Sequence, residues 1–311
     1  MPAAHRIIVV IGPTASGKSL LAARLAARLG GEVLSADAMA VYRGMDVGTA
    51  KPGAAECALA PHHLVSVLDP ADRCDVSRWL DLAEGVLAGL RARGAPAIVA
   101  GGSPLYTKAL IEGLSAGPPR DETVRAALNA AFIADPAALW AELLRVDAVY
   151  AAGRHPNDQR RIVRALEVFR LTGRPYSSFH TTDRRRRTDL TALQIGLQWD
   201  RAVLHERIAK RCEAMFAAGL VDEVRGLKDR LCPEARQAVG YKEALDFLDG
   251  KHDLATARTL VERNTRHLAK HQMTWYRRFP DIVWLDGAAT DLLERVEALA
   301  RKFLRDGNPS P

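Results

Sequence analysis

A glycine-rich loop stands between a buried strand and a helix near the start of the chain. Residues 6–11, RIIVVI, read as the strand, and residues 12–19, GPTASGKS, match the spacing G-x-x-x-x-G-K-[ST]. The apolar positions that follow recur at helical spacing: Leu20, Leu21, Leu25 and Leu29. A loop in this setting binds phosphate groups, because its backbone N–H groups and the positive end of the helix dipole face the anion.

The residue types within this loop indicate its ligands. Lys18 is expected to neutralise phosphate oxygens, and the hydroxyl of Ser19 is expected to ligate Mg²⁺. The candidate phosphate site is the whole loop: Gly12, Pro13, Thr14, Ala15, Ser16, Gly17, Lys18 and Ser19. The motif indicates a diphosphate-like anion and does not by itself indicate ATP.

Strands alternate with helices on either side of a stretch without strands. Strands are predicted over 32–38, 62–68, 95–102, 191–199 and 281–286, and helices over 76–94, 200–218, 220–231, 240–249 and 254–278. This alternation predicts an α/β, P-loop NTPase-like core: a parallel sheet with helices on both faces. The core takes in residues 1–116 and 190–311, and an all-helical insertion occupies 117–189.

Two further candidates follow predicted strands. Asp37 ends the second strand, at the sheet edge where open α/β folds bind ligands, and a carboxylate there holds Mg²⁺ or acts as a general base. Ser103 follows Gly101-Gly102 and offers a hydroxyl to a substrate. The alternative is that both side chains cap helices. Thr49 and Lys51 are expected to lie near the same edge of the sheet.

Positive charge is concentrated in two places. Residues 154–187 contain ten arginines against Asp158, Glu167 and Asp183, a local balance of +7 that equals the net charge of the whole chain. Residues 258–278 form a second basic stretch. Clustered arginine beside a phosphate loop favours a polyanionic partner such as a nucleic acid, although a solvated charged face remains the alternative.

Other features exclude several classes of protein. The four cysteines are far apart and form no C-x-x-C pair, which argues against zinc and disulfides and fits a reducing cytosol. His62-His63 lacks the spacing of a helical metal site and is expected to be a loop or strand-edge pair. We expect no signal peptide and no membrane span, because no apolar run approaches about 20 residues.

Taken together, these motifs resemble the tRNA dimethylallyltransferases, which are also called tRNA isopentenyltransferases. The resemblance runs nearly end to end and is carried by GPTASGKS, SADAMAVYRGMDVGTAKP, PHHLVSVLDP, GGSPLY, HPNDQRRIVRALEV, QAVGYKEAL and NTRHLAKHQMTWYRR. It implies that the loop grips the diphosphate of dimethylallyl diphosphate. It also implies an acceptor: the exocyclic N6 amine of the adenosine 3′-adjacent to the anticodon in the tRNA anticodon stem-loop.

The resemblance assigns roles to the candidates. Asp37 matches the general base, Ser103 matches a hydroxyl residue, and Lys18 stabilises the departing diphosphate. From their spacing, one helical turn apart, Arg207 and Arg211 are candidates to close over that diphosphate, with a surface ion-pair face as the alternative for each. Two departures stand out: Ser103 replaces the usual Thr, and Ala38 replaces the usual Ser.

Since an amine inside an anticodon loop must be flipped out to react, RNA-reading residues should flank the site. The resemblance places tRNA contacts at Asp37, Ala38, Met39, Ala40, Arg160, Arg161, Ile162, Val163, Arg164, Arg236, Gly240, Tyr241, Lys242, Lys270, Gln272, Trp275 and Arg277. Trp275 and Tyr276 could stack on bases, with core packing as the alternative for Trp275. The run at 184–187, RRRR, is expected to be a mobile, solvated loop.

Three other functions remain open from the residues alone. They are an isopentenyltransferase acting on free adenine nucleotides, a small-molecule P-loop kinase, and a non-catalytic RNA-binding switch. The basic insertion favours a polymeric substrate over the first two, and a carboxylate beside a hydroxyl at neighbouring strand ends argues against the switch. We expect a cytoplasmic monomer that uses Mg²⁺ and does not contact a membrane.

Overall fold

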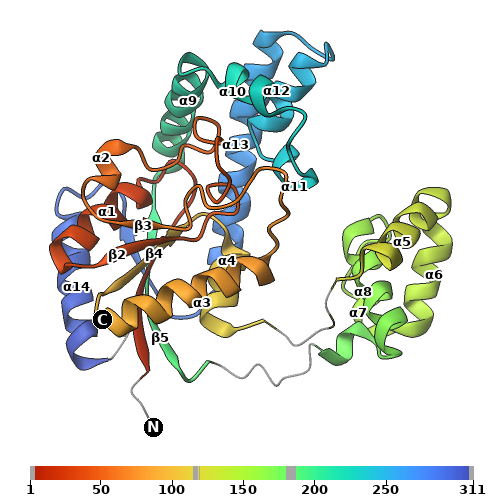
Figure 1. The fold of residues 1–311 in the computed structure, drawn as a ribbon, viewed down its shortest axis with the longest axis horizontal. Helices are drawn as coiled ribbons and strands as arrows, with labels where there is room; N and C mark the ends of the chain where they lie inside the picture. The colour runs from red at the N-terminus through yellow and green to blue at the C-terminus, as the bar shows by residue number, and fades with distance from the viewer. Residues whose placement is uncertain (1–3, 115–117, 119, 180–186, 308–311) are drawn as a thin grey trace. The chain divides into compact units, whose positions relative to one another are not determined.

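Six parallel strands form one sheet in the order β3-β2-β4-β1-β5-β6 (Figure 1). The computed structural model describes residues 4–114, 118, 120–179 and 187–307. The strands are β1 (His5–Ile11), β2 (Glu32–Ser35), β3 (His62–His63), β4 (Ala97–Gly101), β5 (Leu190–Gln198) and β6 (Ile282–Asp286). Because all six run the same way, the ends of β2, β4, β1 and β5 meet at one edge, which is where ligands bind in open α/β sheets.

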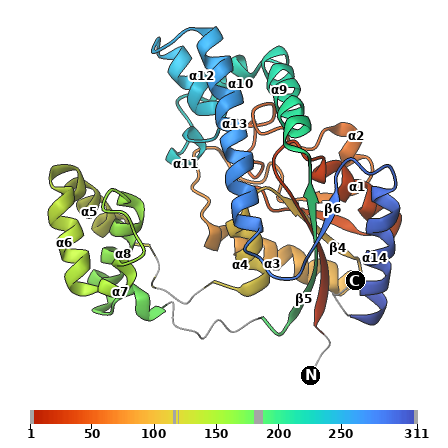
Figure 2. The same ribbon diagram turned by 180° about the vertical axis from the view of Figure 1, so that it is seen from behind.

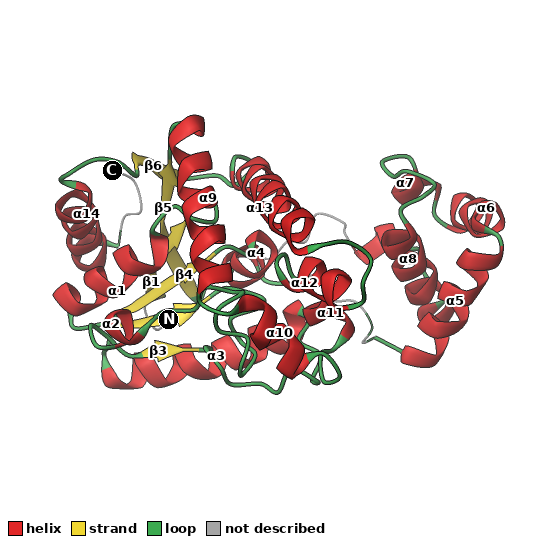
Figure 3. Ribbon diagram, turned by 90° about the horizontal axis from the view of Figure 1, so that it is seen from above, coloured by secondary structure: helices red, strands yellow, loops and turns green. Residues whose placement is uncertain are grey.

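Helices cover both faces of this sheet (Figures 2 and 3). Those of the core are α1 (Lys18–Leu29), α2 (Ala54–Cys57), α3 (Val76–Arg93), α4 (Pro104–Glu112), α9 (Arg201–Ala217), α10 (Leu220–Leu227), α11 (Pro233–Arg236), α12 (Tyr241–Leu248), α13 (Leu254–Tyr276) and α14 (Leu292–Asp306). The predicted α/β class, a parallel sheet with helices on both faces, is confirmed. None of the described helices is long and apolar enough to cross a membrane.

Alternate residues of β1 enter two separate cores, as the period of a strand requires. Ile7, Val9 and Ile11 pack in one cluster with residues of α3 and α4. Ile8 and Val10 pack in the other with residues of α1 and α14. Since β1 is buried on both faces, its near-continuous apolar sequence is typical of a central parallel strand.

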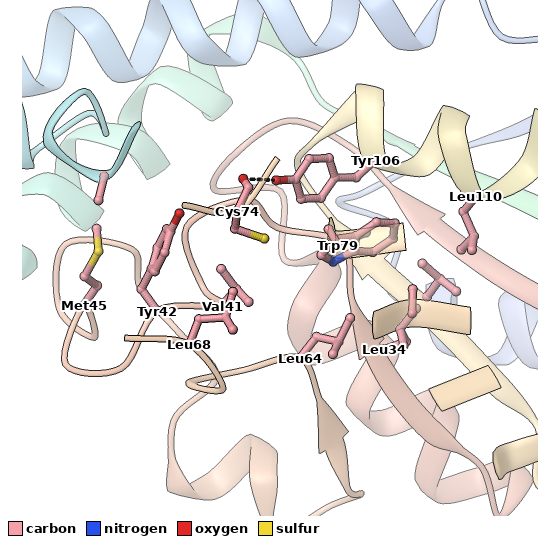
Figure 4. Close-up of a cluster of buried hydrophobic side chains, with 14 of the residues drawn as sticks. Leu34, Val41, Tyr42, Met45, Leu64, Leu68, Cys74, Trp79, Tyr106 and Leu110 are labelled. Carbon is pink, nitrogen blue, oxygen red and sulfur yellow. Dashed lines mark hydrogen bonds between the residues drawn. The ribbon is translucent and has the colours of Figure 1, made fainter. Parts of the chain in front are cut away.

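The first core is anchored by two stacked aromatic rings close to the end of β2 (Figure 4). The ring centroids of Trp79 and Tyr106 lie 4.8 Å apart. Trp79 Nε1 donates to the carbonyl of Ser35 at 3.2 Å, and the Tyr106 hydroxyl donates to the carbonyl of Cys74 at 3.1 Å. These bonds satisfy the polar atoms of both buried rings and fix the backbone just before Asp37.

Residues Met1–Ile111 and Arg187–Pro311 form one compact unit, the core, and Glu112–Arg186 form a second, whereas the insertion was predicted at 117–189. Its helices are α5 (Glu122–Ala134), α6 (Pro136–Val146), α7 (Ala148–Ala151) and α8 (Gln159–Thr172), followed by the 3-10 helix η1 (Tyr176–Phe179). The described part of this unit contains no strand. Its own apolar cluster includes Leu128, Leu143 and Leu166.

One buried carboxylate, Glu167 on α8, links α8 to the start of α5. It accepts hydrogen bonds from Arg125 at 2.5 Å, from Arg164 at 2.9 Å and from the N–H of Asp121 at 2.9 Å. Burial alone would raise the pKa of Glu167, but these bonds outweigh it and hold the pKa below its usual range. Arg164 is therefore used inside the unit.

Several element boundaries differ from the prediction. The third strand covers only His62–His63, because Leu64 and Ser66 take positive φ angles of 58° and 54°. The backbone N–H groups of residues 66–68 donate instead to the carbonyls of residues 40 and 41. The second strand stops at Ser35, and α10 ends at Leu227. The helices α2 and α11 were not predicted. Leu20, expected on the buried face of α1, is 39% exposed.

Close contact between strand ends gives a test of the fold. A Cβ added to Gly101 would overlap the backbone carbonyl of Ala36, so we expect Gly101→Ala to lower the free energy of unfolding by about 1–3 kcal/mol or more. Exposed Gly85 in α3 is the matched control, since nothing lies within 4 Å of an added Cβ. Gly85→Ala should raise stability by about 0.5–1 kcal/mol. Denaturant unfolding measures the stability of both variants. Equal free energies of unfolding for Gly101→Ala and Gly85→Ala would contradict the close approach of Gly101 to Ala36.

Candidate active site

The glycine-rich loop joins the end of β1 to the start of α1. Gly17 takes a left-handed φ of 86° at the N-cap of α1, a conformation that favours glycine. A Cβ on Gly12 would lie 2.9 Å from Ser16 Oγ and 3.2 Å from Leu197 Cβ, so the loop packs tightly against β5. The first N–H groups of α1 have no helical partner and favour an anion at this end.

Helix α13 ties this loop to the loop after β4. Gln272 Oε1 accepts the Thr14 N–H at 2.8 Å, and Gln272 Nε2 donates to the carbonyl of Gly102 at 2.7 Å. One turn further along, the hydroxyl of Tyr276 donates to the carbonyl of Gly101 at 3.2 Å. Both side chains are buried. The amide of Gln272 thus braces the phosphate loop, and Tyr276 is not available to stack on a base.

Arg207 and Trp199 hold the outer side of the loop. Arg207 Nε donates to the carbonyl of Ala15 at 2.8 Å, and its guanidinium lies 4.2 Å from the centroid of the Trp199 ring. Trp199 Nε1 donates to the carbonyl of Ser16 at 3.1 Å. Arg207, a candidate to close over the diphosphate, is thus committed in part to the backbone of the loop.

Two cations, buried Lys18 and half-buried Arg211, line one cavity. Lys18 is 8% exposed, and burial, with a smaller contribution from the charge of Arg211, lowers the pKa of Lys18 to about 8. Burial also lowers the pKa of Arg211, whose guanidinium donates to the Thr49 carbonyl at 3.3 Å while its buried Nε has no partner among the described residues. Concentrated positive charge with unused donors is a site for an anion.

Asp37 and Ser103 meet at the neighbouring strand ends. Asp37 Oδ1 accepts the N–H groups of Met39 at 2.9 Å and Ala40 at 3.2 Å, an N-cap type of contact that here caps a turn and not a helix. Ser103 Oγ accepts the N–H of Ala38 at 3.0 Å. The carboxylate of Asp37 therefore has a fixed orientation, with Oδ2 making no hydrogen bond to the described residues.

The cavity itself is lined from many segments. It takes in Lys18, Ser19, Asp37 and Arg211, but Ser103 lies outside its lining. The predicted neighbours Thr49 and Lys51 also line it. Apolar side chains among the lining residues, together called the apolar wall, are Met39, Met215, Val239, Val261 and Leu268. The lining thus combines charged groups suited to phosphates with apolar side chains suited to a short hydrocarbon chain.

No group of three or more His, Cys, Asp or Glu side chains is placed to hold a metal within the described part of the chain. A Mg²⁺ ion bound mainly through substrate phosphates needs only one or two protein oxygens. Ser19 and Asp37 both line the cavity and offer such oxygens. The expected strand-edge histidines form β3, the edge strand of the sheet.

Comparison with known proteins shows the family of this chain. The family model for IPP transferase matches residues 40–279. The chain belongs to the IPP transferase family. It is 44% identical to the tRNA dimethylallyltransferase of Geobacter sulfurreducens over 302 residues, 96% of each chain, and 43% identical to that of Ralstonia nicotianae over 314 residues, 97% of each.

Two solved structures of this family share the fold. The full-length tRNA isopentenylpyrophosphate transferase of Bacillus halodurans is 38% identical, with a TM-score of 0.70 over 96% of both chains. A eukaryotic dimethylallyltransferase acting on tRNA is 25% identical, with a TM-score of 0.85 over 99% of this chain and 81% of that one. The match thus extends through the core and the insertion.

Some of the residues that the sequence predicted to contact tRNA have side chains that pack or form hydrogen bonds inside the protein. Ile162 and Val163 are buried in the insertion, which contradicts side-chain contact with RNA. Fully buried Tyr241 donates to Glu223 at 2.5 Å, and Arg236 donates to the carbonyl of Lys228 at 2.7 Å. Helical spacing and charge alone did not reveal these internal partners.

Other predicted contacts remain on the surface. The exposed residues are Arg160, Arg161, Lys242, Lys270 and Arg277. Arg161 also pairs with Asp158, so Arg160, Arg161 and Arg164 do not act as one open face. Half-buried Trp275 lies outside the core clusters, with its ring 6.3 Å from that of His271. These residues stay predictions.

The run at 184–187 was expected to be a solvated loop. Arg187 instead has a 16% exposed side chain and bonds to Glu84 at 3.2 Å and Asp189 at 2.6 Å. These contacts raise the pKa of Arg187 above its usual value, first through the hydrogen bond to Asp189. Residues 184–186 lie outside the described residues.

The lowered pKa of Lys18 predicts a pH dependence. Below pH 8 the free protein carries the ammonium, and as pH rises through about 8 the ammonium is lost, so affinity for inorganic diphosphate should fall by about tenfold between pH 7 and 9. Calorimetric titration with Mg²⁺ present measures this. Lys18→Met is the control, because in this variant the ionisation of Lys18 is removed and that of diphosphate itself remains. An identical change of diphosphate affinity with pH in both proteins would contradict the assignment.

Proposed function

We propose that this protein transfers a dimethylallyl group from dimethylallyl diphosphate to N6 of the adenosine 3′-adjacent to the anticodon of tRNA, releasing diphosphate. One observation carries the proposal: buried Lys18 and half-buried Arg211, beside a phosphate loop, line the cavity that Asp37 also lines. The names of the relatives, tRNA dimethylallyltransferases, support the same activity.

The reaction is a substitution at carbon. The lone pair of the N6 amine forms a bond to the allylic carbon, and the bond from that carbon to oxygen breaks, with its electron pair leaving on the diphosphate. The proton that the amine loses passes to the carboxylate of Asp37. No phosphoryl group is transferred, so the phosphate loop serves to bind a leaving group.

The charge that develops on the diphosphate is stabilised by groups fixed before the reaction. The N–H groups of the loop and the start of α1, the Lys18 ammonium and the Arg211 guanidinium surround the anion end of the cavity. When Mg²⁺ is bound, it would neutralise part of the phosphate charge, and the hydroxyl of Ser19 would hold it. The apolar wall excludes water from the allylic group.

The acceptor needs RNA contacts outside the cavity. A base in the anticodon loop must leave the stack to reach Asp37. Exposed Lys242, Lys270 and Arg277 on the core, and exposed Arg160 on the insertion, are suited to phosphate contacts. That the protein works as a cytoplasmic monomer stays a prediction.

The deciding experiment combines the protein with Mg²⁺, bulk tRNA and isotopically labelled dimethylallyl diphosphate, without ATP. Label recovered in tRNA supports the proposal. Label recovered only in AMP or ADP would indicate the free-nucleotide activity. ATP hydrolysis without alkyl transfer would indicate a kinase or a switch.

Two substitutions test the proposed roles at the strand ends. Asp37→Asn keeps an oxygen for the Met39 and Ala40 N–H groups but loses the base, so transfer should fall by about 10²- to 10⁴-fold while tRNA affinity stays within about twofold. Ser103→Ala should slow transfer, whereas Ser103→Thr, which keeps the hydroxyl, should be tolerated. Single-turnover rates and tRNA binding separate the steps, and an equal loss of both in Asp37→Asn would make Asp37 structural.

A further inference from the structure

The carboxylate of Glu223, on α10, collects four hydrogen bonds. Oε2 accepts the backbone N–H groups of Asp46 at 2.8 Å and Val47 at 2.6 Å. Oε1 accepts the N–H of Gly48 at 2.9 Å and the hydroxyl of Tyr241 at 2.5 Å. Three successive N–H groups form a concave anion site, and an internal carboxylate occupies it.

These bonds hold one side of the segment 46–52, DVGTAKP, whose other side lines the cavity. Residues 48–52 all belong to the cavity lining. The carbonyl of Thr49 accepts a bond from the guanidinium of Arg211 at 3.3 Å. The segment therefore connects Glu223, outside the cavity, with a cation that faces the proposed diphosphate.

Hydrogen bonds of Lys51 and close packing at Gly48 also hold this segment in place. The side chain of Lys51 is 6% exposed and donates to Asp46 at 2.7 Å, to Ser66 at 2.8 Å and to the carbonyl of Tyr42. A Cβ on Gly48 would lie 2.5 Å from the ring of Tyr241 and 2.8 Å from Leu220. The segment thus lies directly against α10 and α12, and a shift at Glu223 would be transmitted to Thr49.

Resting on the proposed function, we propose that Glu223 is a positioning residue for diphosphate binding, acting through the 46–52 segment on Arg211. A carboxylate is suited to this task because both of its oxygens accept. In glutamine one acceptor becomes an NH₂ group that opposes the N–H donors beside it. Those backbone groups would then need other partners, and the segment would move.

The test is equilibrium binding of inorganic diphosphate, with Mg²⁺, to the full chain and its variants. Glu223→Gln should raise the dissociation constant by about tenfold, and Tyr241→Phe, which removes one donor of four, should raise it by about two- to threefold. Transfer by Glu223→Gln should show a KM for dimethylallyl diphosphate raised by the same factor, with tRNA affinity within about twofold of the parent.

Asp222→Asn is the matched control. It makes the same change of charge on the adjacent residue of α10, whose side chain is 79% exposed and pairs only with Arg225 among the described residues. It should leave diphosphate binding unchanged. A Glu223→Gln protein that melts at a lower temperature but binds diphosphate like the parent would overturn the proposal, because Glu223 would then be a structural tie alone.

The same samples distinguish a failure of this inference from a failure of the proposed function. Transfer to tRNA is measured on the parent beside diphosphate binding. A parent that binds diphosphate without alkylating tRNA would contradict the proposed function, while the comparison of Glu223→Gln with Asp222→Asn would still decide the role of Glu223. A parent that binds no diphosphate would contradict both.

Discussion

Burial of positive charge beside a phosphate loop is the constraint on which this structure depends. Lys18 and Arg211 are withdrawn from water, and the pKa of each is lowered mainly for that reason. Such burial is unfavourable in the free protein and becomes favourable when an anion enters. The surrounding framework keeps these cations in place: Gln272 and Trp199 bind the loop, and Thr49 binds Arg211.

The core was predictable from sequence where local pattern and tertiary environment agree. The loop in residues 12–19, the strand before it and the helix after it each follow from short-range rules, and β1 is apolar because it is buried on both faces. The extent of β3 was wrong, since Leu64 and Ser66 leave the strand conformation and residues 66–68 pair with a loop distant in sequence. No short window of sequence contains that pairing.

The site residues that directly follow strands were predictable from sequence, whereas the contacts that support them from distant helices were not. Lys18, Asp37 and Ser103 follow strands of a parallel sheet, and strand order brings such positions together. Gln272, Arg207 and Glu223 act from helices far along the chain, and their bonds to the backbone of distant loops cannot be seen in the sequence. Gln272 was predicted to contact tRNA and Arg207 to close over the diphosphate, whereas Glu223 was not singled out. For Trp199, its place at the carboxyl end of the predicted strand at 191–199 was an available signal.

A division of tasks emerges from these contacts. The sheet edge and α13 fix the phosphate loop, and α10 with α12 fixes the segment 46–52, of which residues 48–52 line the cavity. The insertion has its own core and its own buried charge hub at Glu167.

The most direct measurement is a crystal structure with Mg²⁺ and an unreactive thio analogue of dimethylallyl diphosphate. Our account predicts the diphosphate on the N–H groups of residues 12–19, between Lys18 and Arg211, with the allylic carbon directed towards Asp37. A diphosphate bound elsewhere, or an allylic chain directed away from Asp37, would contradict the claim that this phosphate loop holds a leaving group.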